Sequence, residues 1–251
     1  MHTTLIATMI AACLFTAVLL GWWLRRCLPQ HHLGTETKDT IKLAMGLVAT
    51  MTALLLGLLV NSAKASSDAA RSEVIAMAAK VALLDRVLTL YGPEAAPARA
   101  RFREATELAI RQMWTEQRNL QSQLAPNTQV GNAVYFALQD LSPRDDTARN
   151  LKAQAVSFAA DIAQIRTLLL AQSTPSISKP LLLVVVAWLV VIFLSFSLVA
   201  PSNATATLAL LVSALSVSGA IFLILELDRP FSGLIRISDE PLLNALHQPV
   251  N

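Results

Sequence analysis

The stretch Leu43–Val60, with the sequence LAMGLVATMTALLLGLLV, contains no charged residue. A helix needs roughly 20 apolar residues to cross a hydrocarbon core of about 30 Å. Ile41 extends the apolar run at one end, and the long side chain of Lys42 can reach the lipid headgroups. The stretch therefore predicts a membrane-spanning helix.

Three more stretches of similar length also lack Asp, Glu, Lys and Arg: Leu5–Leu24, Leu181–Ala200 and Ala204–Leu225. The first could be mistaken for a signal peptide. No basic residue precedes it and Arg25-Arg26 follow it, so we expect a retained membrane helix. Only Pro201-Ser202-Asn203 separates the last two stretches. The sequence predicts an all-α membrane protein with four transmembrane helices in two hairpins, formed by residues 1–63 and 179–226.

The charged residues are concentrated between the two hairpins. Hydrophobic residues make up 54% of the chain and charged residues 15%, against about 25% charged in ordinary soluble domains. Residues 64–178 hold 13 of the 20 basic and 11 of the 17 acidic residues. They predict an extramembrane helical bundle inserted between helices 2 and 3, followed at residues 227–251 by an interfacial C-terminal tail. The near balance of charge in the insert gives no basic face for nucleic acid.

The apolar residues of the insert have helical spacing. The first set alternates by three and four residues, as in a coiled coil, and comprises Val74, Met77, Val81, Leu84, Leu88 and Tyr91. Gly92-Pro93 is expected to end this helix, which can continue unbroken from the second span because no Gly or Pro lies between Asn61 and Val74. Further helices are predicted over 95–124, around Val134 and Leu138, and after Ser142 as N-cap. Such stripes form the core of a solvated bundle or, alternatively, pack between subunits.

Features of catalytic, metal or cofactor sites are not found in the sequence. Cys13 and Cys27 do not have the spacing of metal ligands, and His31-His32 is best interpreted as a solvated loop pair. The chain has neither a glycine-rich phosphate loop nor a nucleophile elbow. The four spans carry no ionisable group in their interiors, which disfavours coupled transport. We expect a protein that is not an enzyme and that has no cofactor.

Two spans contain stripes of small residues, which allow helices to approach closely in lipid. In the second span the stripe is Gly46, Thr50, Ala53 and Gly57, and Asn61 extends it. Helix packing is one interpretation; the other is a pore lining for a weakly selective path, because its hydroxyl and amide groups carry no fixed charge. In the fourth span we expect a helix-packing stripe of Ala206, Ala209, Ser213, Ser216 and Ala220.

Polar residues follow the fourth span directly. Glu226, Asp228 and Arg229 are costly near the membrane unless they are paired or reach water. We interpret them either as part of an interfacial anchor or as a polar knot at one mouth of an assembly, with Asp228 and Arg229 as a pair. Further along, Ser238 is expected to cap a short helix that contains Leu242 and Leu246.

The segment ELDRPFSG at residues 226–233 carries a family resemblance. Together with Trp188, Phe193 and Phe196 ahead of APSN at 200–203, and with the glycine-bearing second span, it resembles the bestrophin-like domain family of bacterial and plant membrane proteins. The resemblance implies a distant likeness to bestrophins, which are pentameric anion channels lined by their second helix. The aromatic and proline constriction of a bestrophin neck has no counterpart in Leu43–Val60, and no acidic calcium loop is recognisable.

The sequence thus predicts an oligomeric, ion-channel-like membrane protein with the second helix nearest the axis. The expected partners are membrane lipid, further copies of the chain and small ions, with anions favoured by the family resemblance alone. The alternative is a non-conducting scaffold or sensor whose helical insert binds a partner protein.

The orientation follows from the loop between the first two spans, which contains Arg25, Arg26, Lys38 and Lys42. The positive-inside rule makes this loop cytoplasmic in a bacterial inner membrane, with the N-terminus, the insert and the C-terminus outside. Other membrane ends are also flanked by basic residues, so the opposite orientation stays open; these residues are Lys64, Arg71, Lys80 and Lys179.

Overall fold

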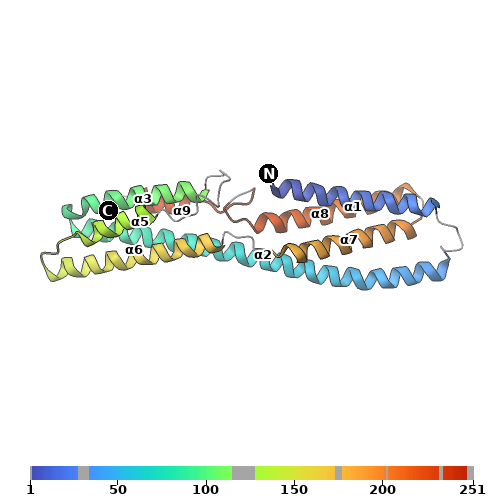
Figure 1. Cartoon of the computed structure of the whole chain (residues 1–251), viewed down its shortest axis with the longest axis horizontal. Coiled ribbons are helices and arrows are strands. Elements are labelled where there is room, and N and C mark those ends of the chain that lie inside the picture. Colours follow the sequence, from blue (N-terminus) through green and yellow to red (C-terminus); the bar gives the residue numbers. More distant parts are fainter. Residues whose placement is uncertain are drawn as a thin grey trace. The chain divides into compact units, whose positions relative to one another are not determined.

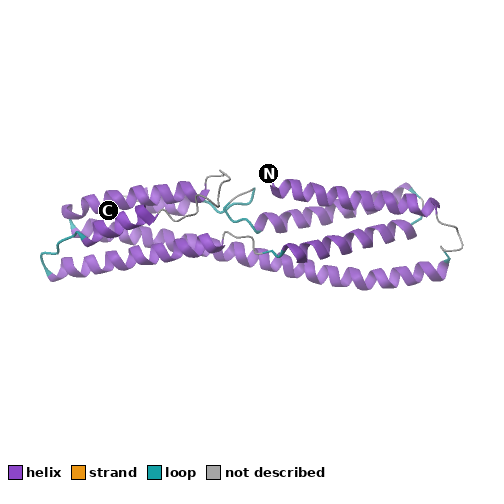
Figure 2. Ribbon diagram, in the orientation of Figure 1, coloured by secondary structure: helices purple, strands orange, loops and turns teal. Residues whose placement is uncertain are grey.

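A computed structural model describes residues 2–27, 34–114, 128–172, 177–201, 203–231 and 234–247. Within these ranges the regular structure is helical and no strand occurs (Figures 1 and 2). The elements are α1 (His2–Cys27), α2 (Thr35–Tyr91), the 3-10 turn η2 (Pro93–Ala95), α3 (Ala96–Trp114), α5 (Thr128–Gln139), α6 (Asp146–Gln172), α7 (Lys179–Val199), α8 (Ala204–Leu227) and α9 (Glu240–His247).

Four helices are long and apolar enough to cross a membrane: α1, α2, α7 and α8. Each covers one of the four uncharged stretches, apart from Ala200 directly after α7, so the predicted apolar helices are confirmed. The arrangement of these helices as two hairpins stays a prediction. Because α2 has 57 residues and a helix rises about 1.5 Å per residue, it is about 85 Å long and only part of it fits a hydrocarbon core. Because α2 runs to Tyr91, the expected unbroken continuation of the second apolar stretch into the seam is confirmed.

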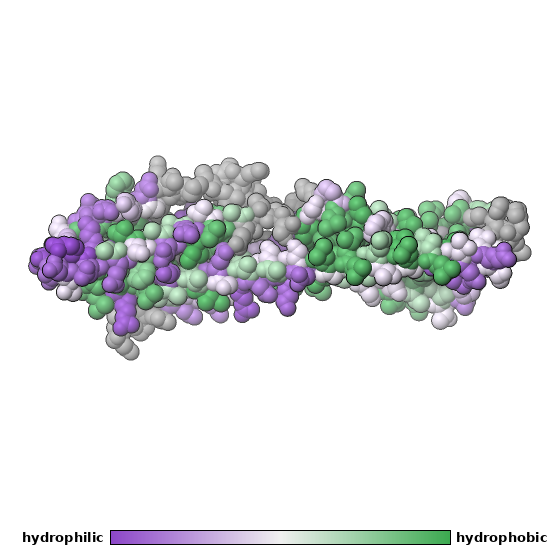
Figure 3. All heavy atoms as spheres, turned by 90° about the horizontal axis from the view of Figure 1, so that it is seen from below, coloured by the Kyte–Doolittle hydropathy of each residue, from purple (hydrophilic) through white to green (hydrophobic). Residues whose placement is uncertain are grey.

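The helices form two compact units. Unit 1 comprises Met1–Ser67 and Pro175–Arg229, and unit 2 comprises Asp68–Thr174 and Pro230–Asn251. Unit 1 thus contains the four apolar segments, and Figure 3 shows hydrophobic residues covering much of this part of the chain. Unit 2 contains most of the predicted insert together with the residues that follow Arg229.

In unit 1, α1 packs along both α7 and α8. The contact with α7 is close at Gly21, where an added Cβ atom would lie 2.6 Å from the Leu194 carbonyl oxygen and 2.8 Å from the Ser197 Cβ atom. The Ser197 hydroxyl donates a hydrogen bond of 2.6 Å to the carbonyl oxygen of Val18. A small residue on one helix and a hydroxyl on the other therefore bring two apolar helices together, as expected for packing in lipid.

Gly21→Ala is expected to destabilise unit 1 because its methyl group would collide with the α7 backbone. Gly219→Ala is the matched control. Gly219 lies in α8 with nothing within 4 Å of its added Cβ, so alanine should be neutral or stabilising by up to about 1 kcal/mol through helix propensity. Thermal unfolding of the full chain in detergent, followed by circular dichroism, measures both. Equal melting temperatures for the two variants would contradict the close packing of α1 and α7.

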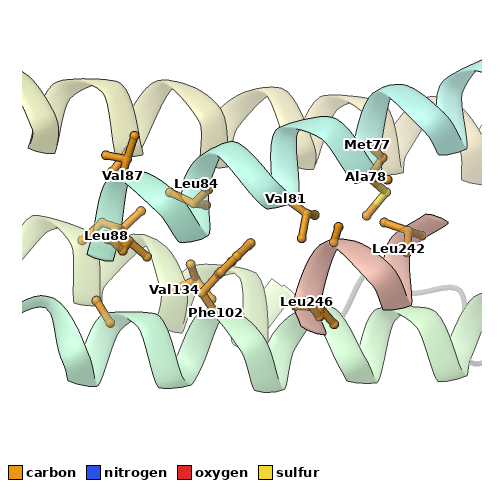
Figure 4. Close-up of a cluster of buried hydrophobic side chains, with 14 of the residues drawn as sticks. Met77, Ala78, Val81, Leu84, Val87, Leu88, Phe102, Val134, Leu242 and Leu246 are labelled. Atoms are coloured by element: carbon orange, nitrogen blue, oxygen red, sulfur yellow. The ribbon is translucent and has the colours of Figure 1, made fainter. Parts of the chain in front are cut away.

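Unit 2 has a core to which α2, α3, α5, α6 and α9 contribute. The predicted seam of α2 faces this core, with buried side chains at Val74, Met77, Val81, Leu84 and Leu88. Figure 4 shows Leu242 and Leu246 of α9 beside this part of α2, with Phe102 of α3 and Val134 of α5 further along. The stripe in the α2 seam is thus the core of the chain's own bundle, which was the simpler of the two sequence interpretations.

Local backbone and side-chain features explain where α2 ends and where α6 begins. Gly92 has φ +108° and ψ −171°, a region open almost only to glycine, and α2 ends just before it as expected. The predicted N-cap of α6 is wrong. The helix begins at Asp146, and the Asp145 side chain, not Ser142, accepts a hydrogen bond of 2.6 Å from the Ala148 amide. The helix expected over 95–124 is α3 as far as Trp114; residues 115–127 lie outside the described residues.

Candidate functional site

The predicted small-residue stripe of α2 is exposed along its whole length. Gly46, Thr50, Ala53, Gly57 and Asn61 are all exposed, and an added Cβ would meet nothing within 4 Å at either glycine. The Thr50 hydroxyl donates a hydrogen bond of 2.8 Å to the Gly46 carbonyl oxygen, so its proton is used within the helix. Its oxygen lone pairs stay available to water or an ion. The structure therefore brings all five residues to one open face.

The opposite face of the same segment packs inside unit 1. Thr52, Leu59 and Ala63 are buried, and Leu55 and Leu56 pack against the same cluster. Only 11% of the apolar window of α2 is buried, compared with 22–28% for the other three candidate spans. Of the four spans, α2 therefore has the largest share of residues that are not buried inside the chain. Some of these residues are small or polar.

The predicted packing stripe of α8 does not face the chain's own core. Ala206 is half-buried, while Ala209, Ser213, Ser216 and Ala220 are exposed. The side of α8 that packs is instead formed by Ala214, Ser218, Ile221 and Ile224. The Ser213 and Ser216 hydroxyls donate to carbonyl oxygens one turn earlier in α8, at 2.9 Å each, which satisfies their protons inside the helix. A packing role of this stripe against another molecule stays a prediction.

The three charged residues expected in the polar knot lie at the end of α8. Glu226 and Asp228 are buried and Arg229 is half-buried. Asp228 is the C-cap residue, and its amide donates to the Ile224 carbonyl oxygen at 3.2 Å. Neither Glu226 nor Asp228 is without an interaction partner. That Asp228 forms an ion pair with Arg229 stays a prediction. That the three charged residues lie at one mouth of an assembly is also still a prediction.

The chain after Arg229 packs into unit 2. The Phe231 ring contacts the Trp114 ring edge-to-face at 5.5 Å between centroids, and the Trp114 indole N–H donates to the Ile237 carbonyl oxygen at 2.7 Å. The Ser238 hydroxyl accepts from the Glu240 amide at 3.2 Å, consistent with its expected capping role. Leu242 and Leu246 of α9 then enter the core. Sequence analysis placed this tail at the membrane interface and did not predict these contacts.

Unit 2 also contains a buried ionic cluster that sequence analysis missed. The Asp85 carboxylate of α2 accepts four hydrogen bonds of 2.7–3.1 Å from the guanidinium groups of Arg99 and Arg103, which lie one turn apart on α3. Burial alone would raise the pKa of Asp85, but the hydrogen bonds and positive charges of the two arginines hold this pKa below its usual value. The sequence pattern that could have predicted this cluster is an acidic residue directly after Leu84 of the seam, together with two arginines spaced by four residues in the next helix.

Asp85→Asn should lower the free energy of unfolding of unit 2 by about 3 kcal/mol, the low end for a broken buried ion pair, because it leaves two partly buried guanidinium groups without their carboxylate. The matched control is Asp161→Asn. Asp161 pairs with Lys80 at 2.7 Å, but the two side chains are 40% and 35% exposed, so the loss should stay below about 1 kcal/mol. Hydrogen exchange of α3 amides in the full chain in detergent reports both losses. Similar losses in the two variants would refute the structural role of Asp85.

The same variant should change the response to acid. A carboxyl group with a lowered folded-state pKa contributes stability above its unfolded pKa of about 3.9, and the contribution is lost as the pH falls through the folded value. The wild-type chain should therefore lose more stability than Asp85→Asn on acidification below about pH 4.

Other chemistry-bearing residues do not assemble into a site in the described part of the chain. No group of three or more His, Cys, Asp or Glu suited to a metal ion occurs there. Cys13 and Cys27 are exposed free thiols. His247 is exposed at the end of α9, where its Nδ1 lies 2.7 Å from the Leu243 carbonyl oxygen. His31 and His32 lie outside the described residues.

The four apolar helices of spanning length, together with a helical unit that carries most of the charge, are consistent with a membrane protein whose described residues form helices and no strand. The chain belongs to the Bestrophin-like domain family, whose match covers residues 11–242 and so nearly the whole chain. Comparison with curated proteins and with solved structures found no match.

Proposed function

We propose that this protein forms an oligomeric, ion-channel-like assembly in the cell membrane, with α2 nearest the axis. The observation that carries the proposal is the open face of α2, where Gly46, Thr50, Ala53, Gly57 and Asn61 leave space beside the helix. In the assembly this face lines a water-filled path. Small side chains keep the path wide. The Thr50 hydroxyl oxygen and the Asn61 amide offer polar contacts without a fixed charge, and the amide N–H groups are donors suited to anions.

Membership in the family supports a channel over an enzyme, and its kinship with bestrophins favours small anions as the permeant ions. The lining itself contains no charged residue from Leu43 to Val60, so the path should be weakly selective. We propose the orientation given by the basic loop between the first two spans, with both termini and the insert outside.

Gly57→Leu should reduce ion flux about tenfold or more because its isobutyl group would project into the path. Gly219→Leu is the matched control, because Gly219 is also an exposed helical glycine with open space. It lies on a face of α8 with large exposed apolar residues suited to lipid: Leu208, Val212, Leu215 and Leu223. The measurement is ion flux and single-channel recording after reconstitution into liposomes.

If the well-folded wild-type protein conducts none of a range of anions and cations, the channel proposal is overturned. That outcome would favour the alternative, a scaffold or sensor whose insert binds a partner protein. The structural observation in its favour is an aromatic pair on α5, Tyr135 and Phe136, whose rings are both exposed and whose centroids lie 6.3 Å apart. Equal flux through the two glycine variants would overturn the assignment of the lining to α2.

A further inference from the structure

The last two turns of α1 combine aromatic and basic side chains at the end of an apolar stretch. Trp22 and Trp23 lie at the end of the uncharged run Leu5–Leu24, and Arg25 and Arg26 follow it directly. Trp23 is 58% exposed and Arg26 is also exposed, while Trp22 and Arg25 are half-buried. Such side chains suit the headgroup region of a membrane, because each has an apolar body and a polar end.

The Arg26 guanidinium group is held against the Trp22 ring. Its central carbon lies 3.5 Å from the ring centroid. A stacked guanidinium group uses its flat face for this contact, so its N–H groups point outward in its own plane. Arg25 and Arg26 follow Trp22 by three and four residues and therefore share one side of the helix with it. Because long helical side chains lean toward the N-terminus, the Arg26 guanidinium lies at the level of Trp22.

No carboxylate neutralises these arginines in the part of the chain that the structure describes. Neither Arg25 nor Arg26 forms an ion pair there, and residues 28–34, which follow α1, contain no Asp or Glu. The end of α7 lies beside this end of α1, as the hydrogen bond from Ser197 shows, and residues 195–204 also lack acidic groups. This end of unit 1 therefore has an excess of positive charge.

We propose that Trp22, Arg25 and Arg26 bind the phosphate of an anionic phospholipid headgroup. A guanidinium group donates paired hydrogen bonds to a phosphate, and a lipid with a net negative charge also compensates the two arginines. Leu19 lies one turn before Trp22 on the same side of α1 and is 55% exposed, so it can contact an acyl chain of the same lipid. This apolar neighbour favours a lipid over free phosphate.

The proposed lipid site lies wholly within unit 1 and requires neither a pore nor a second copy of the chain. Phosphatidylcholine has the same phosphate group, but its choline cation cancels the charge. We therefore expect the site to prefer phosphatidylglycerol, which has a net negative charge. Loss of this preference would leave the channel proposal untouched, and a protein that binds the lipid without conducting ions would overturn the channel alone.

Fluorescence quenching tests the site in bilayers. Trp114→Phe and Trp188→Phe leave the two tryptophans at the end of α1 as the chain's only ones. Phosphatidylglycerol with brominated acyl chains is titrated into phosphatidylcholine bilayers that contain this full-length variant, and brominated phosphatidylcholine gives the reference. We expect phosphatidylglycerol to associate at least about fivefold more strongly, and this ratio to fall to about one when Arg25→Gln and Arg26→Gln are added. Equal ratios with and without the arginines would overturn the proposal.

The matched control removes two positive charges elsewhere. Lys64→Gln and Arg71→Gln change exposed residues of α2 beyond its apolar stretch, and neither residue forms an ion pair within the described ranges. We expect this double variant to keep the preference for phosphatidylglycerol at the tryptophans of α1. An equal loss of preference in the control would show attraction to positive charge in general and would overturn the site.

Thermal unfolding gives a second test in a chain that keeps all its tryptophans. Phosphatidylglycerol in place of phosphatidylcholine in nanodiscs should raise the melting temperature of the wild-type chain, and Arg25→Gln with Arg26→Gln should abolish this rise. Inorganic phosphate added to phosphatidylcholine nanodiscs should leave the melting temperature unchanged. An equal rise with inorganic phosphate would identify free phosphate as the ligand and overturn the lipid site, as would a rise that persists without the arginines.

Discussion

The continuity of α2 is the constraint on which the other features depend. Its 57 residues contain no proline, and the glycines at 46 and 57 occur where the segment is otherwise strongly apolar. Each backbone carbonyl before the last turn therefore has a helical donor four residues later. Because the hydrogen-bond ladder is unbroken, the apolar stretch and the seam that faces the core of unit 2 lie on one helix. The helix ends only at Gly92, whose backbone conformation is one that other residues rarely adopt.

This continuity gives α2 two faces with different neighbours. On one side, Leu59 and Ala63 join the cluster of unit 1, while Val74 and Leu84 join the core of unit 2. On the other side, small residues such as Gly57 give way to large ones such as Leu83. In the span, the small side chains leave space beside the helix. The span part of this face is thus suited to an open path.

Features that depend on local patterns could be predicted from the sequence. The four apolar helices follow from uncharged stretches of bilayer length, and the end of α2 follows from Gly92-Pro93. Short polar motifs were less reliable. Ser142 and Asp145 both fit an N-cap, and the choice of Asp145 depends on where the backbone turns into α6, which residue spacing does not specify.

Features that depend on contacts distant in sequence could not be predicted. Asp85 meets Arg99 and Arg103 only because α3 folds back along α2, and Trp114 meets Phe231 across more than a hundred residues. Likewise, helical spacing places the small residues of α2 on one face of that helix and those of α8 on one face of the other. It did not show what either face contacts, since the α8 stripe lies away from its chain's own core.

The central claim is that water reaches the open face of α2 within the membrane, and thiol accessibility tests it most directly. Thr50→Cys and Leu215→Cys, each in a chain with Cys13 and Cys27 replaced by serine, place a thiol on the α2 face and on the leucine-rich face of α8. The protein is reconstituted in liposomes and treated with a charged, membrane-impermeant thiol reagent. We predict rapid modification of Thr50→Cys and protection of Leu215→Cys by lipid. Equal protection of both positions would contradict the account.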